Sequence, residues 1–96
     1  MENKNIIALE EYFRANKIFE RFGISRIGIF GSYGRGEKYN DIDLFLEENL
    51  DYEKRMQLKT LVENAFHTRV DVVVKEFAEP IILHHALKEM QYATRS

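Results

Sequence analysis

Two aspartates of this 96-residue chain are spaced so that they could bind a divalent metal ion together. Asp41 and Asp43 begin an alternating apolar segment, and on a strand such residues share one face with Cα atoms roughly 6.6 Å apart. Like charges so placed repel unless a cation or a proton lies between them, and aspartate is a poor strand former. The pair therefore predicts a site for a hard cation such as Mg²⁺. The alternative is that Asp41 ends a turn while Asp43 faces solvent.

Asp71 is the only acidic residue in a valine-rich segment, residues 69–74. If this segment pairs beside residues 41–46, Asp71 joins Asp41 and Asp43 in one cluster. Three carboxylates beside a phosphate-binding turn are the parts needed for two-metal phosphoryl chemistry. The alternative is a solvent-facing strand residue.

Four of the five glycines lie within nine residues, at 28, 31, 34 and 36. Gly31 ends an apolar segment, and Ser32 could cap a short helical turn that runs through Arg35. Backbone N–H groups at a strand-to-helix turn of this kind form a natural site for phosphate. The alternative is a glycine-rich reverse turn without a ligand.

Apolar spacing predicts the elements that must position these residues. We expect a helix over 4–22, kinked near Asn16 and Lys17, and two later helices over 52–66 and 80–90. The expected strands are 26–31, 41–46 and 69–74. The link between the first two strands is too short for a parallel crossover, so they should be antiparallel. The helix over 52–66 is long enough for a right-handed parallel crossover. The prediction is an α/β fold of order α-β-β-α-β-α, with a small mixed sheet packed with helices.

Composition limits the class of protein. The formal net charge is −2 and the pI is near 5.9, so the chain lacks the basic footprint of nucleic-acid-binding proteins, and we expect no direct nucleic-acid binding. The absence of cysteine excludes disulfides, thiolate metal sites and cysteine nucleophiles. There is no long apolar run and no signal-peptide pattern. We expect a single cytoplasmic domain over 1–96 that does not enter a membrane.

The run GSYGRGE at 31–37, followed by DIDL at 41–44, resembles the signature of the minimal nucleotidyltransferase (MNT) domains of the DNA polymerase β superfamily. The resemblance implies a palm-like fold that binds Mg²⁺ and ATP. It implies that Gly31 and Ser32 bind the β- and γ-phosphates and that Arg35 neutralises phosphate charge or supports the loop. It also implies that Asp41 and Asp43 bind the metals. Asp71 would be the third metal ligand and would act with the metal to deprotonate the acceptor. Two departures are Gly34, where members commonly have alanine, and a shorter loop between Ser32 and Asp41. We expect the first to be a mild change that loosens the turn.

These features favour an enzyme that transfers AMP from ATP to a hydroxyl. A chain of this length has no room for a separate acceptor domain, so we expect the acceptor to be another protein. The resemblance implies a HEPN-domain toxin, modified on a tyrosine, with this chain as the antitoxin. Three alternatives stay open: a module that neutralises its partner by binding alone, a nucleotidyltransferase for a small molecule, and a homo-oligomer that builds the acceptor site between subunits.

Aromatic and histidine residues near these segments have less specific interpretations. Tyr33 and Tyr39 flank the predicted site, where they either stack on a base or are exposed loop residues. His84 and His85 are adjacent on an expected helix and so point about 100° apart, which disfavours shared metal binding.

Overall fold

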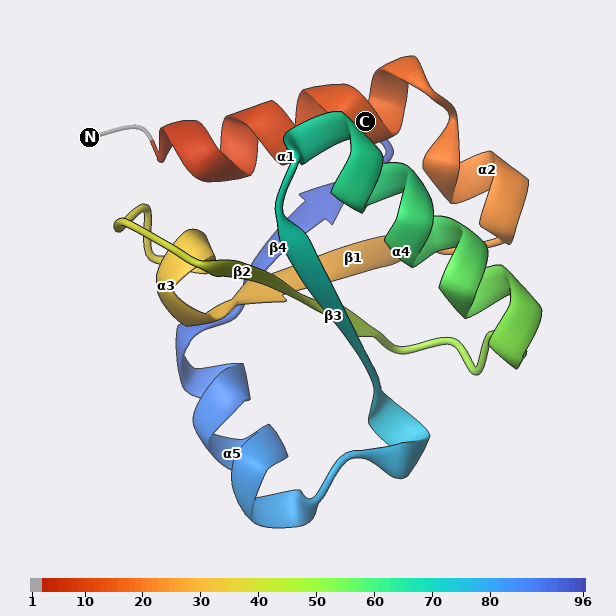
Figure 1. The fold of residues 1–96 in the computed structure, drawn as a ribbon. Helices are drawn as coiled ribbons and strands as arrows, with labels where there is room; N and C mark the ends of the chain where they lie inside the picture. The colour runs from red at the N-terminus through yellow and green to blue at the C-terminus, as the bar shows by residue number, and fades with distance from the viewer. Residues whose placement is uncertain (1–2) are drawn as a thin grey trace.

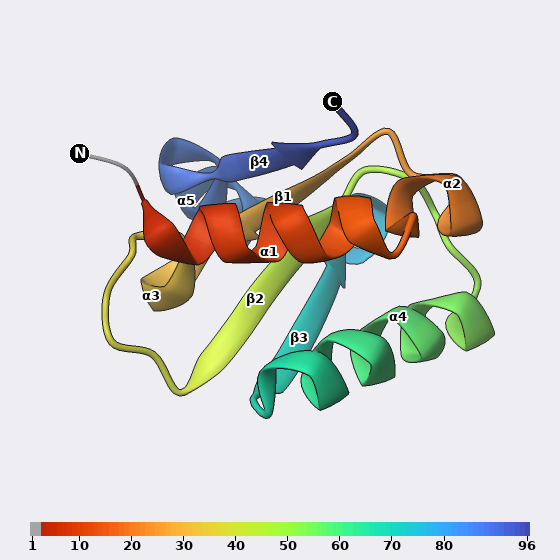
Figure 2. The same ribbon diagram turned by 90° about the horizontal axis from the view of Figure 1, so that it is seen from above.

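A computed structural model describes residues 3–96 (Figures 1 and 2). The helices are α1 (Lys4–Ala15), α2 (Ile18–Phe22), α3 (Gly31–Gly34), α4 (Tyr52–Phe66) and α5 (Pro80–Glu89), with a 3₁₀ turn, η1, at Lys75–Phe77. The strands are β1 (Arg26–Phe30), β2 (Asp41–Leu46), β3 (Arg69–Val74) and β4 (Gln91–Thr94). The mixed α/β architecture confirms the predicted fold class.

The strands form one sheet in the order β3-β2-β1-β4. As predicted, β1 and β2 are antiparallel, whereas β2 and β3 are parallel and are joined through α4. The fourth strand was not predicted from the sequence. It pairs antiparallel with β1, and its four residues are too few to show a clear alternation of apolar and polar side chains.

The first helical segment is divided into two helices. Helix α1 ends at Ala15, and Lys17 adopts a left-handed conformation with φ of 54° before α2 begins at Ile18. The predicted kink is therefore confirmed, but the continuous helix is wrong. The break redirects the chain so that Ile18, Phe19 and Phe22 are all buried in the core.

The hydrophobic core lies between the sheet and the helices α1, α2 and α4, which cover one face (Figure 1). Alternate residues of β2 and β1 point into it, among them Ile42, Leu44 and Ile29. Because side chains alternate along a strand, the residues between them face the opposite side, toward α5. Asp41 and Asp43 belong to this second set. Among residues 3–96, no helix combines the length and the apolar character that a membrane crossing requires.

Candidate functional site

The three predicted aspartates occupy neighbouring positions on one face of the sheet because of the register between β2 and β3. Asp43 is the direct partner of Asp71 in this parallel pairing, and Asp41 precedes Asp43 by two residues on the same face. The antiparallel pairing with β1 sets Phe30, the last residue of that strand, opposite Asp43. The end of β1 is thus adjacent to Asp43.

Asp43 is the electrostatic centre of this group. Burial raises its pKa above the ordinary value for aspartate, and the neighbouring charges of Asp71, Asp41 and Glu89 raise it further. Asp71 is exposed, whereas Asp43 is half-buried. Water therefore screens the repulsion between their charges only in part. A bound cation would favour the charged form and would reverse this shift.

The carboxylates suit a hard divalent cation by donor type and by position on the sheet. In the positions that their side chains occupy, however, no group of three His, Cys, Asp or Glu residues within 3–96 converges closely enough to hold an ion. Mutual repulsion gives the physical reason, since like charges without a counterion separate. The oxygens of Asp41, Asp43 and Asp71 would have to come closer together to bind one ion.

Gly31 joins β1 to α3 at the position nearest to the carboxylates. Its φ of +70° belongs to the left-handed region, which side chains other than glycine rarely adopt. A Cβ atom at this position would also collide with the Asp43 carboxylate oxygen Oδ2 and would lie 3.4 Å from Asp43 Cγ. The positive φ favours glycine here, and any larger residue would also displace the Asp43 carboxylate.

Ser32 does not cap the short helix as predicted. Helix α3 begins one residue earlier, at Gly31, and its N-cap position is occupied by Phe30 without a side-chain hydrogen bond. The positive φ of Gly31 starts the turn directly at the end of β1, which leaves Ser32 within the first turn. Ser32 instead accepts a hydrogen bond from the Glu37 N–H through its backbone carbonyl, at 3.0 Å.

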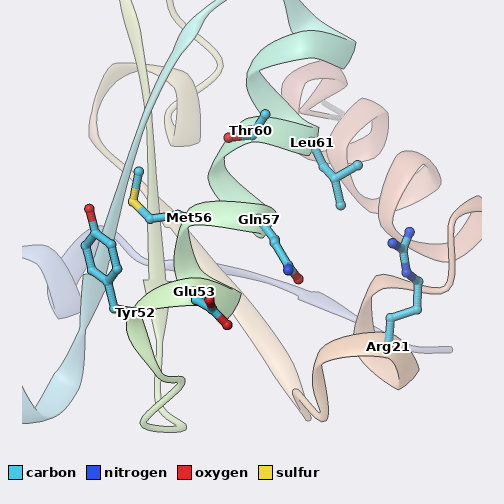
Figure 3. Close-up of a pocket in the computed structure, with 7 residues that line it drawn as sticks. All are labelled: Arg21, Tyr52, Glu53, Met56, Gln57, Thr60 and Leu61. Carbon is cyan, nitrogen blue, oxygen red and sulfur yellow. The ribbon is translucent and has the colours of Figure 1, made fainter.

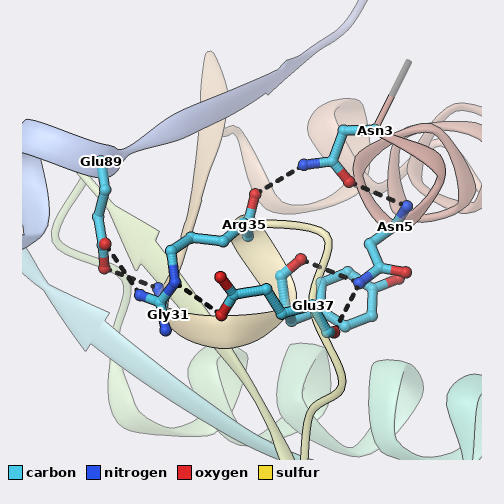
Figure 4. A network of polar contacts seen from close by, with 8 residues as sticks. Asn3, Asn5, Gly31, Arg35, Glu37 and Glu89 are labelled. Carbon is cyan, nitrogen blue, oxygen red and sulfur yellow. Dashed lines mark hydrogen bonds and ion pairs between the residues drawn. The ribbon is translucent and has the colours of Figure 1, made fainter. Parts of the chain in front are cut away.

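Arg35 follows α3 and is held by two carboxylates (Figure 4). Its Nε donates to Glu37 Oε1 at 3.0 Å, and its Nη1 donates to Glu89 Oε2 at 2.9 Å. Glu89 also accepts a hydrogen bond from the Gly31 N–H, at 3.2 Å to Oε1. The predicted phosphate-binding groups Gly31 and Arg35 are therefore bridged by one glutamate from the far end of the chain.

The glycine-rich loop is fastened by the start of α1. Asn3 caps α1 through its Oδ1 atom and donates from Nδ2 to the Gly34 carbonyl at 2.8 Å. Asn5 donates from Nδ2 to the Tyr33 carbonyl at 3.1 Å. Neither asparagine was identified from the sequence, because each contact joins residues about thirty positions apart and leaves no local pattern. The Asn3 cap itself could have been recognised from its residue type before a helix.

Gly34 and Tyr33 differ from their predicted roles. A Cβ atom on Gly34 would lie 2.8 Å from the Ile29 carbonyl oxygen, so glycine fits this close packing and does not merely loosen the turn. Tyr33 is buried in the core and packs edge-on against Tyr39, with ring centroids 4.6 Å apart. Burial, with a contribution from Tyr39, raises the pKa of Tyr33 to about 12. The expectation that Tyr33 is an exposed loop residue or stacks on a base is therefore wrong.

A groove of about 470 Å³ runs beside the carboxylates. Its lining includes the acidic Asp43 and Asp71, the basic Arg55 and Lys59 of α4, and Ile82 of α5. The Arg55 Nε atom is buried and makes no hydrogen bond within residues 3–96. The groove thus offers both signs of charge beside the predicted metal ligands, as a substrate carrying phosphate would require.

A second hollow, of about 490 Å³, lies along α4 and near α2 (Figure 3). Arg21 and Glu53 are its charged residues, and Gln57 and Thr60 also line it. None of the residues predicted for the site contributes to this hollow. The groove that contains Asp43 and Asp71 is therefore the stronger candidate for chemistry.

The chain matches the family model described as polymerase beta, nucleotidyltransferase, over residues 10–92. It belongs to that nucleotidyltransferase family. The matched region includes β1, the glycine-rich loop and all three aspartates. The asparagines at positions 3 and 5, which hold the loop, lie outside it.

Similar proteins agree with membership of the nucleotidyltransferase family. The protein adenylyltransferase MntA of Thermococcus cleftensis is 36% identical over 90 residues, which cover 88% of this chain and 91% of the relative. A crystal structure of a variant of the toxin–antitoxin MntA–HpeT contains a chain that is 25% identical, with a TM-score of 0.63 over 81% of this chain and 69% of that one. A structure described as a candidate minimal nucleotidyltransferase is 26% identical, with a TM-score of 0.69 over 95% of both chains.

Proposed function

We propose that this chain is a Mg²⁺-dependent nucleotidyltransferase that moves AMP from ATP to a hydroxyl of a partner protein. The observation that carries the proposal is the direct pairing of Asp43 with Asp71, with Asp41 on the same face and Gly31 against Asp43. Membership of a nucleotidyltransferase family and the relative named a protein adenylyltransferase support the same chemistry.

The proposed role of each residue follows from its position in the structure. Asp41 and Asp43 would bind the metal, and Asp71, which lines the groove and is exposed, would complete the ligand set. The backbone N–H of Gly31, together with Ser32 and the guanidinium of Arg35, would bind the β- and γ-phosphates. Bound Mg²⁺ supplies charge neutralisation and lowers the pKa of an attacking hydroxyl.

The reaction would be a substitution at the α-phosphorus. The acceptor oxygen forms a bond to that phosphorus while the bond to the oxygen that bridges the α- and β-phosphates breaks. Pyrophosphate leaves, and the acceptor proton passes toward Asp71, the exposed carboxylate of the group. Arg35 and the Gly31 amide would hold the departing phosphates, whose negative charge they complement.

The surface beside the groove favours a protein acceptor. Phe77 and Ile81 are 64% and 73% exposed, and Ile82, which borders the groove beside Asp43 and Asp71, is 55% exposed. Exposed apolar side chains next to a polar groove are typical of protein interaction sites. A partner that covered them would bring its own hydroxyl near the carboxylates. We propose a HEPN-domain toxin as this partner and a tyrosine as the acceptor, in line with the toxin–antitoxin complex among the similar structures.

The decisive experiment labels ATP separately at the α- and γ-phosphates and incubates each with Mg²⁺, this protein and a HEPN-domain toxin. Transfer of AMP labels the partner from the α-phosphate only, whereas a kinase would label it from the γ-phosphate. Asp71→Asn should abolish labelling but leave the complex intact in gel filtration, because Asp71 is exposed and outside the core. If the wild-type protein silences the partner without labelling it, the protein acts by binding alone.

A further inference from the structure

Glu89 is the last residue of α5, and its side chain reaches back to the end of β1 (Figure 4). Its two carboxylate oxygens have different partners: Oε1 accepts from the Gly31 N–H at 3.2 Å, and Oε2 accepts from Arg35 Nη1 at 2.9 Å. An anion with two oxygens thus bridges a backbone amide and a guanidinium, as a phosphate group would.

These two donors are the groups to which the proposed function assigns the triphosphate. The Gly31 amide has a single hydrogen, so it cannot donate good hydrogen bonds to Glu89 and to a phosphate at the same time. Glu89 also adds its charge to the repulsion felt by Asp43, beside the proposed site for Mg²⁺. A triphosphate that approached would therefore meet both an occupied donor and an additional negative charge.

We infer that Glu89 occupies the phosphate site in the nucleotide-free protein and must be displaced before ATP binds. This inference rests on the proposed function. The Arg35–Glu89 contact is suited to exchange, since the two side chains are 43% and 36% exposed. Exposed ion pairs of this kind change an equilibrium constant by about fivefold or less, which is small enough for a triphosphate to overcome. Glu89 then lowers the affinity for ATP, and nucleotide binding releases the end of α5 from Gly31.

The test is the affinity for α,β-methylene-ATP with Mg²⁺, an analogue whose α–β link does not break, measured by isothermal titration calorimetry. Glu89→Gln keeps the shape of the side chain and removes its charge, and it should tighten binding by about fivefold. Glu37→Gln is the matched control, because Glu37 pairs with Arg35 at 3.0 Å but has no hydrogen bond to Gly31. It should tighten binding less than Glu89→Gln does, because it leaves the Gly31 N–H occupied by Glu89.

Two results would overturn the inference. Weaker binding by Glu89→Gln would mean that Glu89 orients Arg35 for phosphate, and equal gains in both variants would mean a general effect of charge. Tripolyphosphate with Mg²⁺ serves as a second probe that lacks the nucleoside. If the wild-type protein binds neither probe, the proposed function fails as it stands. Binding by Glu89→Gln alone would then still support displacement, whereas no binding by either protein would refute it.

Discussion

Replacement of Asp43 by asparagine should stabilise the metal-free protein. The substitution keeps the volume of the side chain and removes the charge at the centre of the carboxylate group. Burial and the charges of Asp71, Asp41 and Glu89 all raise the pKa of Asp43, so the folded state disfavours its ionised form. Asp43→Asn relieves that penalty, and the free energy of unfolding should rise.

The strand register allows an estimate of the size of this effect. Paired strands lie about 4.8 Å apart, so we take about 5 Å as the scale of the separation between the charges of the direct partners Asp43 and Asp71. Two charges at that distance repel by about 0.8 kcal/mol in water and by about 3 kcal/mol at an effective dielectric constant of about 20. Because Asp71 is exposed and Asp43 only half-buried, solvent screening favours the lower end, about 1 kcal/mol. For a domain of this size, that corresponds to a rise in melting temperature of about 4–8 °C.

The assay is thermal unfolding by circular dichroism in EDTA, from pH 7 down to pH 3. A raised pKa in the folded state means that the folded protein takes up this proton before the unfolded chain does. The advantage of the variant should be complete at pH 7, should shrink as the pH falls through the raised pKa, and should vanish near the ordinary aspartate pKa of about 3.9. Glu11→Gln, at an exposed position of α1, controls for the loss of a negative charge elsewhere.

Addition of Mg²⁺ provides the opposite test. The wild-type protein should gain stability from Mg²⁺ while Asp43→Asn gains less, because one proposed ligand is lost. A variant that folds normally but melts at or below the wild-type temperature in EDTA at pH 7 would refute the reasoning. Asp43 would then stabilise the fold and would not be a strained member of a metal site.

Three further substitutions and one ligand titration test the loop and the site. Gly31→Ala should abolish AMP transfer, measured by labelling of the partner, because it strains a left-handed position and pushes Asp43 aside. Gly34→Ala should lower the free energy of unfolding by about 1–3 kcal/mol in urea, since its Cβ meets the Ile29 carbonyl; a stabilised variant would show that the loop adjusts. Asn3→Ala should cost about 1 kcal/mol from the lost helix cap and more from the lost bond to Gly34. Mg²⁺ and ATP together, at about 100 times the dissociation constant, should stabilise the wild-type protein by about 2.7 kcal/mol, and no shift beyond that of either alone would contradict the nucleotide site.

The sequence was sufficient to predict the features that depend on local spacing. Alternating apolar residues identified β2, and a content of apolar and β-branched residues identified β1 and β3. The length of the connections determined the directions of the strands. These two results together place Asp43 beside Asp71. Strand β4 was missed because its four residues show no regular alternation of apolar and polar side chains. Its position also depends on pairing with β1, more than sixty residues earlier in the chain.

The residues that hold the glycine-rich loop could not be predicted in the same way. Asn3, Asn5 and Glu89 each resemble ordinary polar residues at a helix end or on a helix surface, and their roles depend on contacts 28 to 58 positions away in the sequence. A residue pattern records which groups could bind phosphate but not which group of the same chain competes for them. The competition by Glu89 exists only because β4 returns the end of α5 to the edge of β1. The unpredicted strand is therefore also the element that brings a negative charge to the proposed phosphate-binding donors of Gly31 and Arg35.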